Sequence, residues 1–166
     1  MAEEIQDQTD VQTEAEAPAE AVETVTFAEP AKPDAGGFFW GVGRRKAAVA
    51  RVRIRPAKGD KSNFMINGRR MENYFTELRD RNDVVAPLVA TNTEKSVDVY
   101  INVNGGGYVG QAGAILLGVA RALKGMDPSL EPILREHNHL SRDPRRVERK
   151  KYGQRGARRR FQFSKR

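Results

Sequence analysis

The chain has 166 residues, a formal net charge of +7 and no cysteine, which excludes disulfide frameworks, thiolate metal sites and cysteine nucleophiles. No run approaches 18 consecutive apolar residues, so the sequence predicts no membrane span. The first residues are rich in acid and lack the basic region and apolar core of a secretory signal, and they also differ from Arg-rich, acid-poor transit peptides. We therefore expect a cytoplasmic protein.

The charge is distributed very unevenly along the chain. Residues 1–35 hold ten acidic side chains and one basic side chain, a net charge of −9. Residues 36–166 hold 28 basic and 12 acidic side chains, a net charge of +16, and residues 141–166 alone hold 12 basic and 2 acidic ones. A terminal run of like charge favours a polyanionic partner over an ordinary solvated face, and phosphate-rich nucleic acid fits best.

These differences predict three regions. Residues 1–37 combine few aromatics with a high charge of one sign, so they cannot bury enough apolar surface to order themselves and are predicted to be disordered. Residues 38–140 are predicted to form the globular domain, and residues 141–166 a basic RNA-binding tail.

The first predicted strand covers Ala48 to Arg55, where small and β-branched residues alternate with Arg51, Arg53 and Arg55. A turn at residues 56–60 leads to a second short strand at residues 63–66.

Asn67-Gly68 then predicts a tight turn, and Met71 to Phe75 one helical turn. Asp83 to Ala86 fits either a strand or a helix. Pro87 suits the first position of a short helix that reaches about Thr91, because its missing N–H costs nothing there.

A clear alternation predicts a strand from Val97 to Val103. An apolar stripe from Ala112 to Leu123 predicts a helix, which Gly125 is placed to end. Asp127-Pro128 suits the cap and first position of a further short helix that ends near Arg135, and Asp143-Pro144 repeats that signal. Residues from 154 onward lack a core pattern and are predicted to be an extended arm. The predicted core is one small mixed sheet with two main helices over one face.

The segment between the last strand and the long helix contains Gly105, Gly107 and Gly110, a G-x-G-x-x-G motif. A dinucleotide site also needs an acidic residue at the end of a second parallel strand. Asp127 instead follows a helix end, and the chain contains no Gly-Lys-Ser/Thr run for a Walker loop. Two interpretations stay open and are compatible: the glycines permit positive φ and close packing, or exposed N–H groups at the helix start bind phosphate.

Other chemistry is weakly indicated. His137 and His139, near Glu136, are the only histidines and lack a clear third metal ligand. The basic tail is interleaved with Tyr152, Phe161 and Phe163, and flat rings among arginines suit stacking on unpaired bases. The alternative is that these rings pack on the domain, which suits Tyr152 better than Phe163, because Phe163 lies in a strongly polar arm.

The segments GRRKAAVARVRI, NGGGYVGQAGAILLGVARAL, SRDPRRVERKKYG and QFSKR occur in this order and end the chain. Together they resemble the family of bacterial-type small ribosomal subunit protein nine, from about Trp40 to Arg166. Three features depart from the family pattern: the acidic extension, the segment REHNHL before the tail, and Phe161 where proline is common.

The resemblance implies a two-layer α+β domain of β-β-β-α-β-α type with a left-handed crossover, in which residues 83–86 would form the third strand. It implies a structural constituent of the small ribosomal subunit with no catalytic residue, metal or cofactor. Its partners would be ribosomal RNA of the subunit head, neighbouring ribosomal proteins and the anticodon stem-loop of peptidyl-site tRNA. Its location would be the cytoplasmic ribosome.

Carried over by position, the resemblance implies ribosomal RNA contacts at three segments and tRNA contacts at the terminus. The residues expected to contact ribosomal RNA are Gly43, Arg44, Arg45, Lys46, Gly105, Gly106, Gly107, Gly110, Gln111, Arg142, Arg145, Arg146, Arg149, Lys150, Lys151, Arg155, Arg158, Arg159 and Arg160. The residues expected to contact tRNA are Ser164, Lys165 and Arg166. The alternatives are a nucleotide-cofactor enzyme and a non-ribosomal RNA chaperone that uses the same basic tail.

Overall fold

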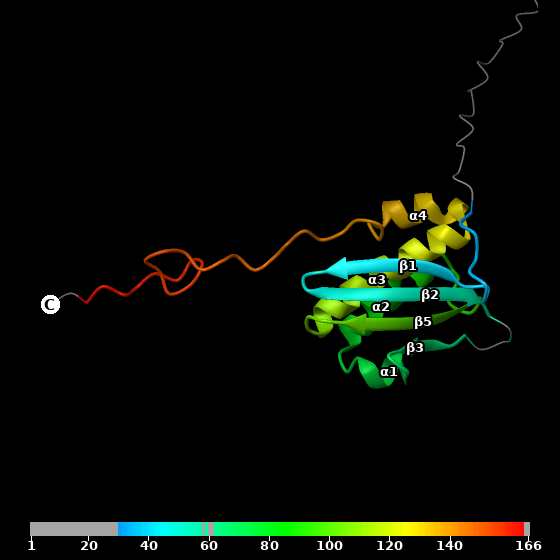
Figure 1. Ribbon diagram of the computed structural model, residues 1–166, viewed down its shortest axis with the longest axis horizontal. Coiled ribbons are helices and arrows are strands. Elements are labelled where there is room, and N and C mark those ends of the chain that lie inside the picture. Colours follow the sequence, from blue (N-terminus) through cyan, green and yellow to red (C-terminus); the bar gives the residue numbers. More distant parts are fainter. Residues whose placement is uncertain (1–29, 58, 60–61, 165–166) are drawn as a thin grey trace, which may run out of the picture.

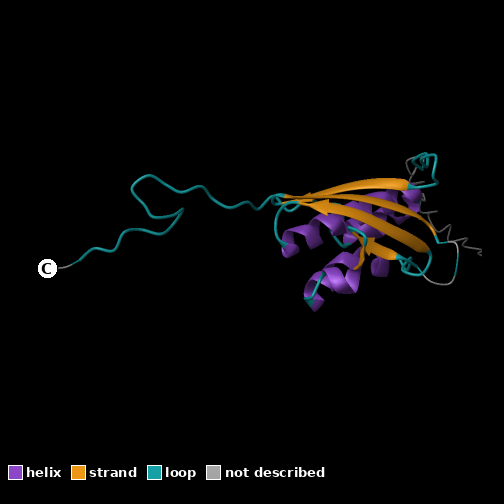
Figure 2. Ribbon diagram, turned by 60° about the horizontal axis from the view of Figure 1, so that its bottom comes forward, coloured by secondary structure: helices purple, strands orange, loops and turns teal. Residues whose placement is uncertain are grey.

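The computed structural model describes residues 30–57, 59 and 62–164. It confirms a two-layer α+β domain in which one five-stranded sheet is covered by helices on a single face (Figures 1 and 2). The elements are β1 (Phe39–Arg45), β2 (Ala48–Pro56), β3 (Phe64–Ile66), β4 (Arg69–Arg70), α1 (Met71–Tyr74), α2 (Leu78–Ala90), β5 (Val97–Asn104), α3 (Tyr108–Met126), the 3-10 helix η1 (Pro128–Leu130) and α4 (Glu131–Glu136).

The strands lie in the order β1-β2-β5-β3-β4. β2 pairs antiparallel with β1 and with β5, whereas β3 runs parallel to β5. The chain passes from β3 to β5 behind the sheet, through α2, and this makes the crossover left-handed (Figure 1). This connection is an exception to the usual right-handed rule, and it agrees with the predicted fold type.

The turn predicted at Asn67-Gly68 is confirmed, since both residues have positive φ (48° and 76°). The Asn67 side chain also extends the sheet beyond the short β3. Its Nδ2 donates to the Val103 carbonyl at 2.9 Å, and its Oδ1 accepts from the Val103 N–H at 2.9 Å. Asn67 therefore acts as one more rung of the β3–β5 pairing.

The sequence analysis did not predict the edge strand β1. Two of its inward-facing positions are glycines, so the strand shows no alternation of apolar and polar side chains. A Cβ on Gly41 would lie 2.1 Å from the Gly118 carbonyl oxygen, and one on Gly43 would lie 1.9 Å from the Ala114 carbonyl oxygen. The backbone of α3 therefore rests directly on the backbone of β1. Only glycine allows an approach this close.

The long helix α3 forms the core of the domain with β2 and β5. The predicted apolar stripe is buried, including Ile115, Val119 and Leu123, and the predicted strands in β2 and β5 are also confirmed. The helix begins earlier than the stripe and ends one residue after Gly125, at Met126. Gly125 thus lies within the last turn, and Asp127 rather than the glycine follows the helix.

Two predictions in the segment before β5 are wrong. Residues 83–86 are helical and belong to α2, so β3 is the third strand of the fold. Pro87 lies inside α2 rather than at its first position. The buried positions Asp80, Val84, Pro87 and Leu88 do follow a helical period, but an acid and a proline conceal that pattern in the sequence.

The segment after α3 agrees with the cap predicted at Asp127, whose Oδ1 accepts from the Ser129 N–H at 3.0 Å and so begins η1. The helix predicted after Asp143-Pro144 is absent, since residues 142–150 have no regular secondary structure. Asp143 makes the same local bond to the Arg145 N–H, at 3.0 Å, but no apolar stripe follows to pack a helix against the domain.

Part of the acidic extension contacts the domain. The Ala31 N–H donates to the Gly125 carbonyl at 2.8 Å, and the Asp34 N–H donates to the Phe38 carbonyl at 2.9 Å. The disorder predicted for residues 1–29 lies outside the described residues. In the part of the chain that the structure describes, no helix is long and apolar enough to cross a membrane.

Candidate nucleic-acid interface

Three predicted RNA-binding segments meet at one end of the sheet. They are the hairpin (Gly43–Lys46), the glycine loop (Gly105–Gln111) and the tail (residues 141–166), which leaves the domain beyond this end (Figure 1). A Cβ on Gly105 would lie 2.6 Å from the Ala47 carbonyl oxygen. The hairpin and the glycine loop are therefore in direct contact.

The glycines have a structural role here. Gly105 and Gly106 have φ values of 73° and 66°, a region that other residues enter only with strain. Gly107 precedes α3, where no side chain caps the helix and no acidic residue occupies the first turn. The packing interpretation is thus confirmed for Gly105 and Gly106, while phosphate binding stays a prediction.

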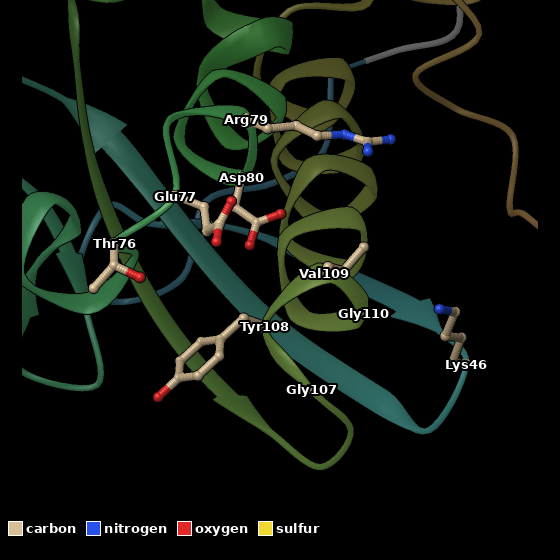
Figure 3. A pocket seen from close by; sticks show the side chains of 9 residues that line it. All are labelled: Lys46, Thr76, Glu77, Arg79, Asp80, Gly107, Tyr108, Val109 and Gly110. Carbon is tan, nitrogen blue, oxygen red and sulfur yellow. The ribbon is translucent and has the colours of Figure 1, made fainter.

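The start of α3 also borders a cavity of about 560 Å³, which is lined by the acidic Glu77 and Asp80 as well as by Arg79 and Lys46. Glu77 and Asp80 project into this cavity from the start of α2, whereas Arg79 points away from them (Figure 3). Negative charge is already present beside the positive end of the α3 dipole. A phosphate would meet less repulsion at the outer side of the glycine loop, where Gly105, Gly106 and Gly107 are exposed.

Gln111 holds the glycine loop in place. Its Oε1 accepts from the Tyr74 hydroxyl at 2.7 Å, and its Nε2 donates to the Gly105 carbonyl at 3.1 Å. The side chain thereby links α1, the loop and the first turn of α3. Since both ends of the amide are bonded within the protein, Gln111 positions the loop and has one remaining N–H to offer a ligand.

Arg45 joins the hairpin to the tail. Its side chain lies across Gly113 of α3, where a Cβ would be 2.3 Å from Arg45 Cδ. Its Nη2 lies 2.9 Å from Asp143 Oδ2, and both side chains are less than one quarter exposed. Arg145 bonds the same carboxylate through its side chain and its N–H, and these bonds, with that from Arg45, hold the pKa of Asp143 well below its usual range.

The neighbouring cations of the hairpin differ from Arg45. Arg44 and Lys46 are exposed, and neither forms an ion pair with another described residue. Gly43 is buried beneath α3, so it shapes the hairpin rather than presenting a surface. Of the four predicted hairpin residues, Arg44 and Lys46 are the ones that can reach an external phosphate.

The tail is mostly extended but contains a loop (Figure 1). Arg158 Nη2 lies 2.6 Å from Glu148 Oε1, and the Arg155 N–H donates to the Arg159 carbonyl at 3.0 Å. The arm predicted from residue 154 onward is therefore not fully extended. The tail cations that are exposed and form no ion pair within the described chain are Arg142, Arg146, Arg149, Lys150, Lys151, Arg155, Arg159 and Arg160.

The aromatic side chains of the tail are not buried against the domain. Tyr152 and Phe163 are fully or almost fully exposed (103% and 94%), so the suggestion that Tyr152 packs on the domain is wrong. Phe161 is about half exposed and lies under Arg155, whose guanidinium is 5.3 Å from the ring centroid. Ser164 is exposed, whereas Lys165 and Arg166 lie outside the described residues.

The outer sheet face was not among the predicted sites. We use this name for the outward-facing side chains of β1, β2 and β5, on the side of the sheet that carries no helix (Figure 2). Arg51, Arg53 and Arg55 lie there together. Their alternation in the sequence placed them on one face, but only the sheet order and the position of α2 and α3 leave that face uncovered.

The competing chemistries find little support. His137 and His139 stack with ring centroids 5.7 Å apart, and burial lowers the pKa of His139. Among the described residues, no group of three or more His, Cys, Asp or Glu side chains could hold a metal. Asp127 caps η1 rather than ending a second parallel strand, which removes the acidic residue that a dinucleotide site would need.

The chain belongs to the ribosomal protein S9/S16 family, whose family model matches residues 43–166. The matched range contains the hairpin, the glycine loop and the whole tail, and it begins at the first glycine of the hairpin. The chain is therefore a structural constituent of the ribosome that binds ribosomal RNA and takes part in translation as a component of a ribonucleoprotein.

Proposed function

We propose that this protein binds ribosomal RNA in the head of the small subunit and that the end of its tail contacts peptidyl-site tRNA. The tail supports this proposal most directly. It presents eight exposed cations without ion-pair partners in the described chain, together with exposed Tyr152 and Phe163. Apolar rings fully exposed among guanidiniums are unfavourable in water but suit stacking and phosphate contacts inside folded RNA.

We assign different parts to the predicted residues of the domain. Arg44 and Lys46 would contact phosphate directly, as would the exposed backbone of Gly105, Gly106 and Gly107. Gly43, Gly110, Gln111 and Arg45 would act through positioning, because their side chains or backbones are engaged within the protein. In this arrangement the domain (residues 38–140) holds one RNA surface rigid, while the tail (residues 141–166) extends into the RNA.

The proposed tRNA contact rests on the reach and chemistry of the terminus. The thirteen residues from Gln154 to Arg166 can span at most about 45 Å when fully extended. Ser164, Lys165 and Arg166 contain no apolar side chain for the domain to bury. A forked guanidinium, a flexible ammonium and a hydroxyl are suited to phosphate and ribose oxygens.

Two deletions separate these parts. Removal of residues 164–166 should leave incorporation into small subunits intact but weaken tRNA binding at the peptidyl site by about 1.5–3 kcal/mol, the range for hydrogen bonds to charged groups. Removal of residues 142–151 should instead impair incorporation. Filter binding of tRNA to purified subunits, with sedimentation to measure incorporation, decides between them. The division is wrong if the short deletion blocks incorporation or leaves tRNA affinity unchanged.

Salt dependence tests whether phosphate contacts dominate. The logarithm of the affinity for a head-domain ribosomal RNA fragment should fall steeply with the logarithm of salt concentration, by about 0.7 to 0.9 for each neutralised phosphate. Sedimentation with small subunits in moderate salt is the companion measurement. Binding to many RNAs without retention on subunits would favour the chaperone alternative.

A further inference from the structure

The outer sheet face forms an ordered grid of arginine, aromatic and amide side chains. The strand register places Trp40 opposite Arg53, and Arg53 opposite Tyr100. In the next row it places Val42 opposite Arg51, and Arg51 opposite Asn102. Because side chains on one face of a sheet recur every second residue, these two rows lie about 7 Å apart.

Four arginines and one carboxylate make up the charge of this face. Arg44 and Arg51 are exposed and form no ion pair with any residue described. The carboxylate, Asp98, is buried (2% exposed) and accepts from Arg55 Nε at 3.2 Å. The net charge is therefore positive, and its accessible part is contributed by Arg44, Arg51 and Arg53.

One end of the face is rigid before any partner binds. The guanidinium carbons of Arg53 and Arg55 each lie 5.3 to 5.6 Å from the ring centroids of both Phe38 and Tyr100. The two rings meet edge to face at 6.0 Å, and Arg55 also donates to the Tyr100 hydroxyl at 3.2 Å. The cluster fixes the orientation of Arg53, which lowers the entropy lost when a ligand binds.

Trp40 lies beside this cluster and is still half exposed (53%). Its Nε1 lies 3.4 Å from Asp34 Oδ2, so the indole is held at one edge while much of its ring surface faces solvent. Asn102 and Asn104 are exposed on the neighbouring strand β5. Amide groups of this kind can pair with the edges of unstacked bases.

We propose that the outer sheet face binds an unpaired segment of RNA, with one base stacked on Trp40 and the backbone phosphates on Arg51 and Arg44. The inference deepens the proposed function, on which it rests, by extending the RNA surface from Arg44 of the hairpin across the side of the sheet that carries no helix. Arginine and aromatic side chains are also enriched in protein interfaces. RNA fits this face better, because it supplies phosphates for Arg44 and Arg51, which have no ion-pair partner among the described residues, together with bases that can stack on Trp40. A two-row grid of flat and cationic groups matches the alternating bases and phosphates of a single strand.

The sequence supplies a specific reporter, because Trp40 is the only tryptophan in the chain. A base stacked on its indole should quench its fluorescence, whereas RNA bound only by the tail should not. We would titrate the full-length protein with a fluorescein-labelled oligouridylate and with a duplex RNA of equal length. Anisotropy reports total binding, and Trp40 emission reports binding at the outer sheet face.

The single strand should quench Trp40 emission more strongly than the duplex does. Trp40→Ala should raise the Kd measured by anisotropy about fivefold or more. Arg51→Gln should weaken the quenching titration and lower its salt slope by about 0.7, while Lys95→Gln, a matched loss of charge at an exposed turn, should change neither. Thermal unfolding of each variant checks that the fold is retained.

The outcomes separate this inference from the proposed function. If anisotropy shows binding but Trp40 emission is unchanged, the inference fails, the tail remains the RNA-binding element, and the outer sheet face is left for a protein partner. If anisotropy shows no binding of either RNA, the proposed function fails as well. Equal quenching by duplex and single strand would overturn the assignment to unpaired bases.

Discussion

Replacing Gly43 with alanine tests whether this residue supports the fold or contacts RNA. The new Cβ would lie 1.9 Å from the Ala114 carbonyl oxygen and 2.5 Å from the Gly118 nitrogen. Real Cβ atoms rarely approach other atoms within 3.0 Å, so β1 and α3 must separate by at least about 1.1 Å, the difference between 3.0 and 1.9 Å. Both obstacles are backbone atoms of the central helix and cannot rotate away.

The expected destabilisation lies at the upper end of the range for overpacking, about 3 kcal/mol. For a domain of this size that lowers the Tm by about 12 to 24 °C. Circular dichroism during heating and in urea measures the change. Gly59→Ala is the control, because nothing lies within 4 Å of its Cβ position.

The alternative is that Gly43 acts mainly by letting RNA approach the hairpin. In that case Gly43→Ala would unfold within a few degrees of the unaltered protein but bind RNA more weakly. That result would refute the packing argument. A large fall in Tm, with RNA affinity retained at temperatures where the variant is folded, would support it.

Three further predictions concern the tail and the acidic extension. Gly113→Ala should displace the flexible Arg45 side chain and so release Asp143, and with it the start of the tail, from the hairpin. Trypsin should then cleave near Arg142 faster, while the free energy of unfolding changes by no more than about 1 kcal/mol; unchanged cleavage would contradict this. Because the pKa of Asp143 is lowered by its bonds to Arg145 and Arg45, its anchoring is fully present above the ordinary aspartate pKa of about 3.9 and is lost only as the pH falls through the lower folded value. A carboxyl NMR titration with a midpoint near 3.9 would refute the assignment. Deleting residues 1–29, which hold nine acidic and no basic side chains, should leave incorporation into subunits intact and increase non-specific RNA binding at low salt, and unchanged binding would exclude electrostatic shielding.

The fold was predictable where one pattern dominates its segment. The alternation in β2 and β5 and the apolar stripe of α3 were each strong enough to identify the element. β1 was not predicted, because Gly41 and Gly43 have no apolar side chain that would make an alternation visible. The lack of a side chain at these two positions is what allows α3 to pack against β1. The full length of α2 was not predicted, because Asp80 and Pro87 lie on its buried face, where a helical pattern would have apolar residues.

The RNA-binding segments were predictable in position but not in the role of each residue. The hairpin, the glycine loop and the tail were identified from glycines, charge and family resemblance. The sequence could not show that Arg45 is bonded to Asp143 or that Gln111 is bonded to Tyr74 and Gly105, because those partners are distant in the chain. Arg44 and Arg45 are adjacent and chemically identical, yet one faces solvent and the other faces α3.

The sequence by itself determined the features that depend on local composition and periodicity: the acidic extension, the basic tail with its aromatics, and the main strands and helix. Only the tertiary structure decided which groups are left free to bind. Strand pairing brought Arg44, Arg51 and Trp40 onto one face, and the left-handed crossover placed α2 on the same side as α3 and left that face uncovered. The physical reason is that exposure is a property of the packed layers. A residue's neighbours along the chain decide which side of a strand it occupies, but the packing of distant elements decides which side meets solvent.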